Sequence, residues 1–212
     1  MSDSFEMRPI ARIRSDFGSK FGVPRQSGLV DALEAAVVFE EPYRNPDALR
    51  GLEGFSHIWL IWAFHQSQRP EWSPTVRPPR LGGNQRVGVF ASRSPFRPNP
   101  IGLSSVRLDH IAYTDALGPV LHVRGADLVD GTPILDIKPY LPYGDCHPEA
   151  TGGFASEPAR PPDRREALRD VLALDPRPRY QQDPDRVYGF LFAGQEVRFT
   201  VDGDRLQVVD IK

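Results

Sequence analysis

The chain has 212 residues, of which 40% are hydrophobic and 25% are charged, so it is long enough to bury a substantial core. Its formal net charge of −2 argues against an obligate binder of polyanions, and its single cysteine excludes an intramolecular disulfide and a cysteine-based zinc site. The charge is uneven, because residues 1–108 are net basic and residues 109–212 are net acidic. The composition therefore still allows a local basic face.

The sequence carries no membrane signal. Its first residues have neither the basic nor the apolar segment of a secretory signal peptide. No apolar run approaches the roughly 20 residues that span a bilayer. We therefore expect a cytoplasmic protein without a membrane partner.

Short apolar segments, many with a period of two, dominate the first two thirds of the chain and predict β-strands. The expected strands are residues 9–15, 35–39, 55–65, 86–91, 105–109, 120–124 and 134–138. Residues 55–65 are rich in β-branched and aromatic side chains, which favours a central strand. Residues 48–52 are typical of a single helical turn. Seven or so short strands separated by Pro and Gly predict a closed barrel or a sandwich.

A composition shift divides the chain. Residues 149–162 are rich in Gly and Pro and predict a linker or mobile loop. We therefore expect a barrel domain at residues 1–148 and a small α+β domain at residues 163–212. The predicted fold class is mainly β, a barrel with short helices followed by this smaller domain.

The small domain is expected to begin with a helix. Asp163 and Glu166 have the spacing of a capping box, and the Pro-rich residues 175–178 would end the helix. Three strands should follow, with a hairpin turn at Asp202-Gly203. Their expected ranges are residues 187–192, 196–201 and 206–211.

The segment Arg93–Ser104 (RSPFRPNPIGLS) is the strongest functional signal. Its three prolines lack an N–H donor and restrict φ, which predicts a rigid extended loop rather than a helix or central strand. A stiff loop suits arginines that meet an anionic ligand. Between Trp72 and Leu108 there is no Asp, Glu or Lys, and the six arginines there are Arg77, Arg80, Arg86, Arg93, Arg97 and Arg107. The alternative is a solvated basic loop.

Two further short motifs are candidate site residues. Pro24-Arg25-Gln26 offers a planar cation beside an amide that both donates and accepts, although it can equally be an ordinary loop. His65-Gln66 follows the most apolar predicted strand. A histidine there is either a core residue or a member of the site.

Residues 127–140 place three carboxylates within one short stretch. Asp130-Gly131-Thr132-Pro133 is a strong turn signal, so Asp130 can simply stabilise a turn, and Asp136 can pair with Lys138 along a strand. The functional alternative is a carboxylate facing a cationic ligand, for which the sulfonium of S-adenosylmethionine is suitable. The chain has neither a G-x-G-x-x-G nor a G-x-x-x-x-G-K-[ST] motif, which argues against a Rossmann or Walker nucleotide site.

These motifs together closely resemble the TsaA/TrmO-like family, over nearly the whole chain. The segments that carry the resemblance are Pro24–Gln26, Leu52–His57, Arg93–Ser104, Asp127–Tyr140 and the tract Asp175–Tyr180. Members of that family are non-Rossmann β-barrel methyltransferases that use S-adenosylmethionine. The resemblance implies methylation of N6 of threonylcarbamoyladenosine beside the anticodon of tRNA, by a homodimer and without a metal.

The resemblance also implies roles for individual residues. The candidates for the catalytic base are His65 and the substrate's own carboxylate, and we expect Arg97, Asn99, Arg177 and Tyr180 to contact the tRNA. The expected cofactor contacts are Pro24, Arg25, Gln26, His65, Gln66, Arg93, Leu103, Asp127, Leu128, Val129 and Asp130. Two alternatives remain at this point, a methyltransferase of the same fold with another substrate and a noncatalytic module that binds nucleotides or nucleic acid.

Overall fold

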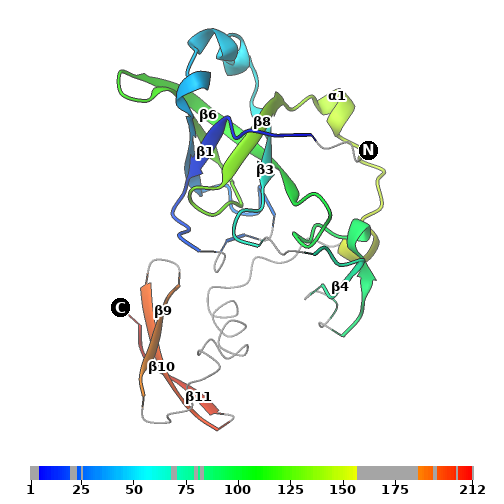
Figure 1. Ribbon diagram of the computed structural model, residues 1–212, viewed down its shortest axis with the longest axis vertical. Helices are drawn as coiled ribbons and strands as arrows, with labels where there is room; N and C mark the ends of the chain where they lie inside the picture. Colours follow the sequence, from blue (N-terminus) through cyan, green and yellow to red (C-terminus); the bar gives the residue numbers. More distant parts are fainter. Residues whose placement is uncertain are drawn as a thin grey trace. The chain divides into compact units, whose positions relative to one another are not determined.

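The computed structural model describes most of the chain, which forms two compact units, residues 1–159 and 160–212 (Figure 1). The described residues are 5–19, 23–24, 26–67, 71–78, 81, 84–156, 186–192, 195–203 and 205–211. No helix among them is long and apolar enough to cross a membrane. Each unit is built around its own sheet.

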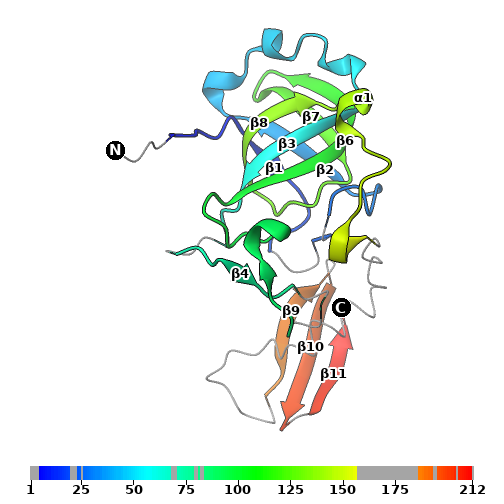
Figure 2. The ribbon, with the colours of Figure 1, turned by 90° about the vertical axis from the view of Figure 1, so that its right-hand side faces the viewer.

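The first unit contains a closed six-stranded barrel in which every pair of neighbouring strands is antiparallel (Figure 2). The strand order around the barrel is β1-β2-β7-β6-β3-β8. Its strands are β1 (Ala11–Arg14), β2 (Glu34–Phe39), β3 (His57–Ala63), β6 (Ile101–Thr114), β7 (Gly118–Arg124) and β8 (Pro133–Pro139). The predicted barrel is thereby confirmed.

Alternating side chains from all six strands fill the barrel. In β3, for example, Ile58, Leu60 and Trp62 point inward, while Trp59 and Ile61 lie on the outer face. This is the consequence of the two-residue period of a strand. The interior is completed by apolar residues of the other strands, including Ile13, Val37, Val106, Leu121, Val123 and Ile134.

Two expectations about strand limits are wrong. β6 begins at Ile101, so residues 101–104 pair with β3 instead of continuing the proline-braced loop. Pro100 is the last proline before β6, and no residue of Ile101–Thr114 lacks the N–H needed for ladder hydrogen bonding. In the predicted strand 86–91, only β5 (Val87–Gly88) forms, and η5 (Val89–Ala91) is a 3-10 turn that buries Val89.

A small hairpin, β4 (Thr75–Val76) with β5, lies within the long connection from β3 to β6. Because β1, β3 and β7 all run toward the same end of the antiparallel barrel, the connections 15–33, 64–100 and 125–132 gather at that end. We call it the loop end. Figure 1 shows it opposite the 3-10 turns drawn in light blue, which are η1 (Glu41–Tyr43), η2 (Pro46–Leu49) and η3 (Leu52–Gly54).

The opposite end is closed by those turns and by the β6–β7 hairpin. η2 and η3 confirm the helical turn expected near residues 48–52, in the tighter 3-10 form. After β8, the chain forms α1 (Pro142–Asp145) and η6 (Gly153–Ala155).

The second unit has a three-stranded antiparallel sheet of β9 (Tyr188–Phe192), β10 (Gln195–Asp202) and β11 (Arg205–Ile211), in the order β11-β10-β9. All three predicted strands are confirmed. Gly203 has a φ of 55° at the expected hairpin turn, where a left-handed backbone favours glycine. The helix expected to start at Asp163 lies outside the described residues.

Candidate functional site

The barrel topology brings four separate predicted motifs, carried by three connections, to the loop end. Gln26 lies in the β1–β2 connection, His65 and Arg93 in the β3–β6 connection, and Asp127 in the β7–β8 connection. These segments are far apart in the sequence but leave the barrel at the same rim. Binding residues on loops held by a rigid scaffold are a common arrangement for a ligand site.

Asp127 is the part-buried carboxylate of this rim. Ser104 Oγ donates a hydrogen bond to Asp127 Oδ1 over 2.6 Å, and the indole N–H of Trp62 donates to Ser104 Oγ over 3.0 Å. The direction of each bond follows from Trp62, whose indole nitrogen can only donate. Ser104 is itself buried, with an exposed fraction of 1%. A hydrogen-bond chain from inside the barrel thus orients the Asp127 carboxylate.

The chain depends on close packing at Gly102. A Cβ placed on Gly102 would lie 2.3 Å from Cε2 and Cζ2 of the Trp62 ring. The indole therefore lies directly on the β6 backbone, in a position that only glycine leaves open. Phe64 packs edge-on against the same ring, with 4.3 Å between the ring centroids.

The surroundings of Asp127 are unfavourable for its charge. Burial raises the pKa of the Asp127 carboxyl group, and the hydrogen bond from Ser104 only partly opposes that shift. The Arg93 guanidinium and the backbone N–H of Ser27 also act to lower this pKa. The structure therefore brings the Arg93 loop and the segment after Gln26 to Asp127, as the sequence motifs predicted for one site.

The rest of the 127–130 turn is held against β1. Asp130 Oδ1 accepts from the Ser15 backbone N–H over 3.1 Å, and its other oxygen lies 3.6 Å from Arg14 NH1. Leu128 is a core residue with an exposed fraction of 1%, and its carbonyl oxygen accepts from Ser15 Oγ over 2.9 Å. Asp130 therefore braces the turn, as the turn alternative allowed, and contacts of these residues with a cofactor stay predictions.

The expected pairing of Asp136 with Lys138 is confirmed. The Asp136 carboxylate forms a 2.9 Å salt bridge with Lys138 on the same strand. Asp136 also accepts a hydrogen bond from the Ile137 backbone N–H. The two residues pair on the outer face of β8, away from the Ser104–Asp127 hydrogen bond.

The loop from Arg93 to Pro100 is braced by its own serines. Ser94 N–H donates to Ser92 Oγ and Phe96 N–H donates to Ser94 Oγ, both over 3.3 Å. The Phe96 carbonyl oxygen accepts from Ser73 N–H, which ties the loop to the start of the β4–β5 hairpin. On this support Arg93 and Asn99 are exposed and Arg97 is half-buried.

The structure positions the other predicted residues less tightly. His65 is half-buried and Gln66 is exposed, just beyond the end of β3. Burial and the nearby Arg12 lower the pKa of His65. Leu103 is 51% exposed on the outer wall of the barrel, opposite in direction to Ser104. A contact of Leu103 with a cofactor stays a prediction. Arg25, Arg177 and Tyr180 lie outside the described residues.

The donor set at the loop end fits S-adenosylmethionine. Its cationic sulfonium and amino groups match the part-buried Asp127 carboxylate, and its own carboxylate matches the Arg93 guanidinium. The part of the chain that the structure describes has no group of three or more His, Cys, Asp or Glu side chains that could hold a metal.

Sequence reasoning missed several residues of this region. The sequence predicts only that Trp62 belongs to a strand and Ser104 to a loop. Their role becomes visible from the strand register, in which Trp62 lies opposite Gly102 and Leu60 lies opposite Ser104. Trp72 and Phe90 were also missed. Their rings stack in the structure although the two residues lie far apart in the sequence.

Comparisons with known proteins identify the relatives of this chain. The family model described as the tRNA-methyltransferase O N-terminal domain matches residues 12–146, and that of the TrmO C-terminal domain matches residues 145–212. The tRNA (adenine(37)-N6)-methyltransferase of Escherichia coli strain K12 is 43% identical over 222 residues, which cover 93% of this chain and 94% of that protein.

Further relatives give the same result. The tRNA (adenine(37)-N6)-methyltransferase of Eikenella corrodens is 47% identical over 163 residues, which cover 70% of this chain and 92% of that protein. The crystal structure of TrmO from Pseudomonas aeruginosa superposes with a TM-score of 0.62 at 34% identity, and the match covers 99% of this chain and 100% of that one. The chain therefore belongs to the tRNA-methyltransferase O family.

Proposed function

We propose that this protein transfers the methyl group of S-adenosylmethionine to N6 of adenine 37 in tRNA. The observation that carries the proposal is the agreement over the full chain with relatives named tRNA (adenine(37)-N6)-methyltransferase. The gathering of the Gln26, Arg93 and Asp127 segments at one rim of the barrel supports it. A noncatalytic binding module would not explain the match to these enzymes.

The chain's own residues would contribute mainly by positioning and electrostatics. S-Adenosylmethionine, when bound, supplies an activated methyl group on a good leaving group. Asp127, oriented by Ser104, would bind the cationic part of the cofactor, and Arg93 its carboxylate. Holding two reactants in line removes much of the entropic barrier to a transfer step.

His65 is the group that we propose accepts the N6 proton. Its lowered pKa keeps the imidazole neutral at neutral pH, so it can take up a proton as the new N–C bond forms. When bound, the cofactor would supply the methyl group to the N6 lone pair and would keep the C–S bonding electrons as a neutral thioether, and His65 would hold the proton that N6 loses.

The finer features of the function belong to the same proposal. We propose that the adenine carries an N6-threonylcarbamoyl group, that the enzyme is a homodimer with its cofactor site near the subunit interface, and that it acts in the cytoplasm. An electron-withdrawing carbonyl on N6 makes the remaining N–H more acidic, which is consistent with a base of modest strength such as His65.

Nucleoside analysis of tRNA tests the proposal. Mass spectrometry of tRNA digests from a deletion strain should lack an N6-methylated adenosine derivative that reappears when the gene is restored. Purified protein should then methylate tRNA from the deletion strain, but not the same tRNA lacking the threonylcarbamoyl group. Methylation of both tRNAs would contradict the finer substrate, and methylation of neither would contradict the reaction.

A further inference from the structure

Two exposed aromatic rings lie side by side on the connection between β3 and β6. Trp72 is 49% exposed and Phe90 is 75% exposed. Their rings stack with 6.4 Å between centroids and an angle of 26° between planes. Since this separation leaves no room for a third ring between them, only their outer faces are open to a ligand.

The β4–β5 hairpin fixes this pair. Trp72 comes shortly before β4 and Phe90 shortly after β5, so the pairing of the two strands brings the rings together. The Val89 N–H donates to the Pro74 carbonyl oxygen over 3.0 Å, and Val89 itself is buried with an exposed fraction of 1%. The backbone beneath the rings is therefore anchored while the rings stay open to solvent.

Three arginines lie on the segments that adjoin the pair. Arg86 NH1 donates to Thr75 Oγ1 over 3.2 Å and remains exposed, as does Arg77 just after β4. Arg97 follows Phe96, whose carbonyl oxygen accepts from the Ser73 N–H beside Trp72. Within the described part of the chain, no salt bridge joins these three arginines to a carboxylate. Their charge is available to an anionic partner.

We propose that this surface, composed of Trp72, Phe90, Arg77, Arg86 and Arg97, docks single-stranded nucleotides of the tRNA that flank the methylated base. The inference rests on the proposed function. An unpaired base would stack on the open face of Phe90, and the arginines would bind the adjoining phosphates. Aromatic rings are the usual platform for splayed RNA bases, and arginine forks suit phosphate oxygens.

Charge decides between RNA and a second protein as the partner. The segment from Trp72 to Leu108 has no acidic residue and no lysine, so the rings sit in an excess of arginine charge. An apolar protein interface is depleted of uncompensated charge at its centre. A polyanion with stackable bases matches both features of the surface. The surface also lies on the β3–β6 connection, the same segment that carries Arg93 of the proposed cofactor site.

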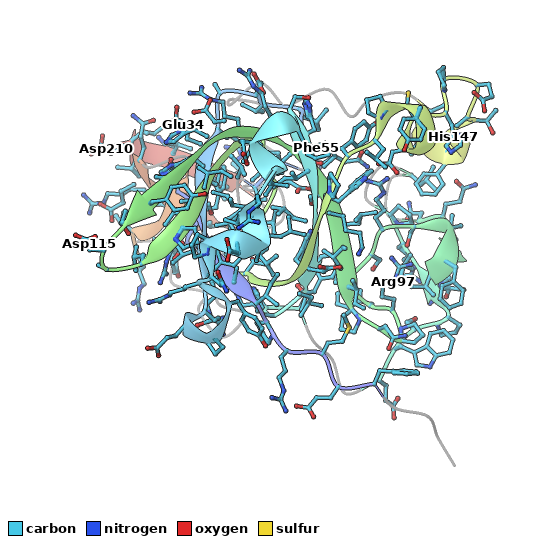
Figure 3. The ribbon with its side chains drawn as sticks, turned by 90° about the horizontal axis from the view of Figure 1, so that it is seen from above. Glu34, Phe55, Arg97, Asp115, His147 and Asp210 are labelled. Carbon is cyan, nitrogen blue, oxygen red and sulfur yellow. The ribbon has the colours of Figure 1, made fainter. Side chains whose placement is uncertain are left out.

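Phe90→Ala is the direct test, with Tyr113→Ala as a matched control. Tyr113 is 62% exposed near the tip of the β6–β7 hairpin, whose Asp115 lies on the other side of the barrel from Arg97 (Figure 3). Anisotropy titrations with fluorescently labelled tRNA from a deletion strain should give about a tenfold higher Kd for Phe90→Ala than for the wild type. Tyr113→Ala should match the wild type, and calorimetry should give all three proteins the same Kd for S-adenosylmethionine.

A second pair of variants tests the arginines. Arg86→Gln should lower the slope of log Kd against log salt concentration by about 0.7–0.9, as expected for one lost phosphate contact. Arg50→Gln, at the opposite end of the barrel, should leave the slope unchanged. These measurements use the full chain, and thermal melting would show whether each variant is folded.

Three outcomes would overturn the inference. The first is a Phe90→Ala variant that binds tRNA like the wild type. The second is an equal loss in Tyr113→Ala, because the effect would then not be local. The third is a Phe90→Ala variant whose mass by light scattering differs from that of the wild type while its tRNA affinity does not. The surface would then be an interface between copies of the chain. A wild-type protein that binds tRNA but transfers no methyl group would instead contradict the proposed function.

Discussion

Strand β3 carries two tryptophans, Trp59 on the outer face of the barrel and Trp62 on the inner face. The hydrogen bonds of each lead to a carboxylate, and the pKa values of these two carboxylates are shifted in opposite directions. On the outer face, the indole N–H of Trp59 donates to Asp145 over 2.9 Å, and the Leu141 backbone N–H donates to the same oxygen over 2.8 Å. These bonds lower the pKa of Asp145. On the inner face, Trp62 reaches Asp127 only through Ser104, and burial raises the pKa of Asp127.

The difference separates a structural carboxylate, Asp145, from the carboxylate that we propose is functional, Asp127. The Asp145 charge is satisfied by donors of its own segment and by Trp59, so the ion stabilises the turn at α1. Asp127 is kept in a part-buried place where its charge is less stable than in water. A site that tolerates an unfavourable charge is a candidate for binding a cation, because the ligand then supplies the missing stabilisation.

Asp127→Asn should give the largest effect and tests the functional side of this comparison. The amide keeps an oxygen that accepts from Ser104, so the geometry is preserved while the charge is lost. The Kd for S-adenosylmethionine should rise about 10- to 100-fold, which corresponds to about 1.5–3 kcal/mol for a charged hydrogen bond. Calorimetry measures the affinity, and labelled methyl transfer to tRNA should fall with it.

Asp145→Asn is the matched control for that variant. It should leave the affinity for S-adenosylmethionine within about twofold of the wild type, because the Asp145 carboxylate accepts hydrogen bonds from Trp59 and from the backbone of its own turn, outside the loop end. Equal losses in the two variants would remove the distinction between the two carboxylates.

Gly102→Ala tests whether the packing of Trp62 positions the site. The new methyl group would overlap the indole, so the ring must move away from the β6 backbone. Overpacking of this kind typically lowers the free energy of unfolding by about 1–3 kcal/mol. Urea denaturation should detect this loss. Gly54→Ala, in η3 at the opposite end, has open space around its Cβ position and should change the free energy of unfolding very little.

Ser104→Ala should have an effect of similar size on stability, with a distinct signature in the pH dependence. The change leaves the buried Trp62 N–H without its acceptor, at a cost of about 1–3 kcal/mol. It also removes a bond that lowers the pKa of Asp127, so that pKa should rise further. The acid limb of the pH–rate profile should therefore move to higher pH, whereas an unmoved limb would mean that Ser104 serves only packing.

The pH dependence of stability should show the smallest effects, with opposite signs at the two carboxylates. The pKa of Asp127 is raised in the folded state, so the folded protein holds the proton more tightly. The free energy of unfolding of the wild type, minus that of Asp127→Asn, should therefore fall as the pH rises above about 4, the ordinary Asp range.

The same difference for Asp145→Asn should behave in the opposite way. The pKa of Asp145 is lowered in the folded state, so its contribution is present above the ordinary Asp range and is lost as the pH falls below about 4. Chemical denaturation at a series of pH values measures both differences. Curves of the same sign would show that the two environments do not differ as described.

The sequence by itself determined the local structure and the family motifs. The short apolar run of residues 35–39 predicted β2, and the two-residue alternation of residues 120–124 predicted β7, because successive side chains of a strand point to opposite faces. The prolines correctly predicted an irregular loop up to Pro100, because they cannot donate to a strand ladder. The motif around Arg93 and the acidic turn at Asp127 indicated the family without any knowledge of their distance from each other.

Only the tertiary structure decided which of these residues meet. The register of β3 with β6 puts Ser104 inside the barrel and Leu103 outside, and a shift of one residue would exchange them. The raised pKa of Asp127 comes from burial by segments distant in sequence, so no local pattern could reveal it. The Trp72–Phe90 pair likewise exists only because β4 pairs with β5. Strand pairing is a non-local interaction, and for this reason the arrangement of the site follows from the closed barrel rather than from any single motif.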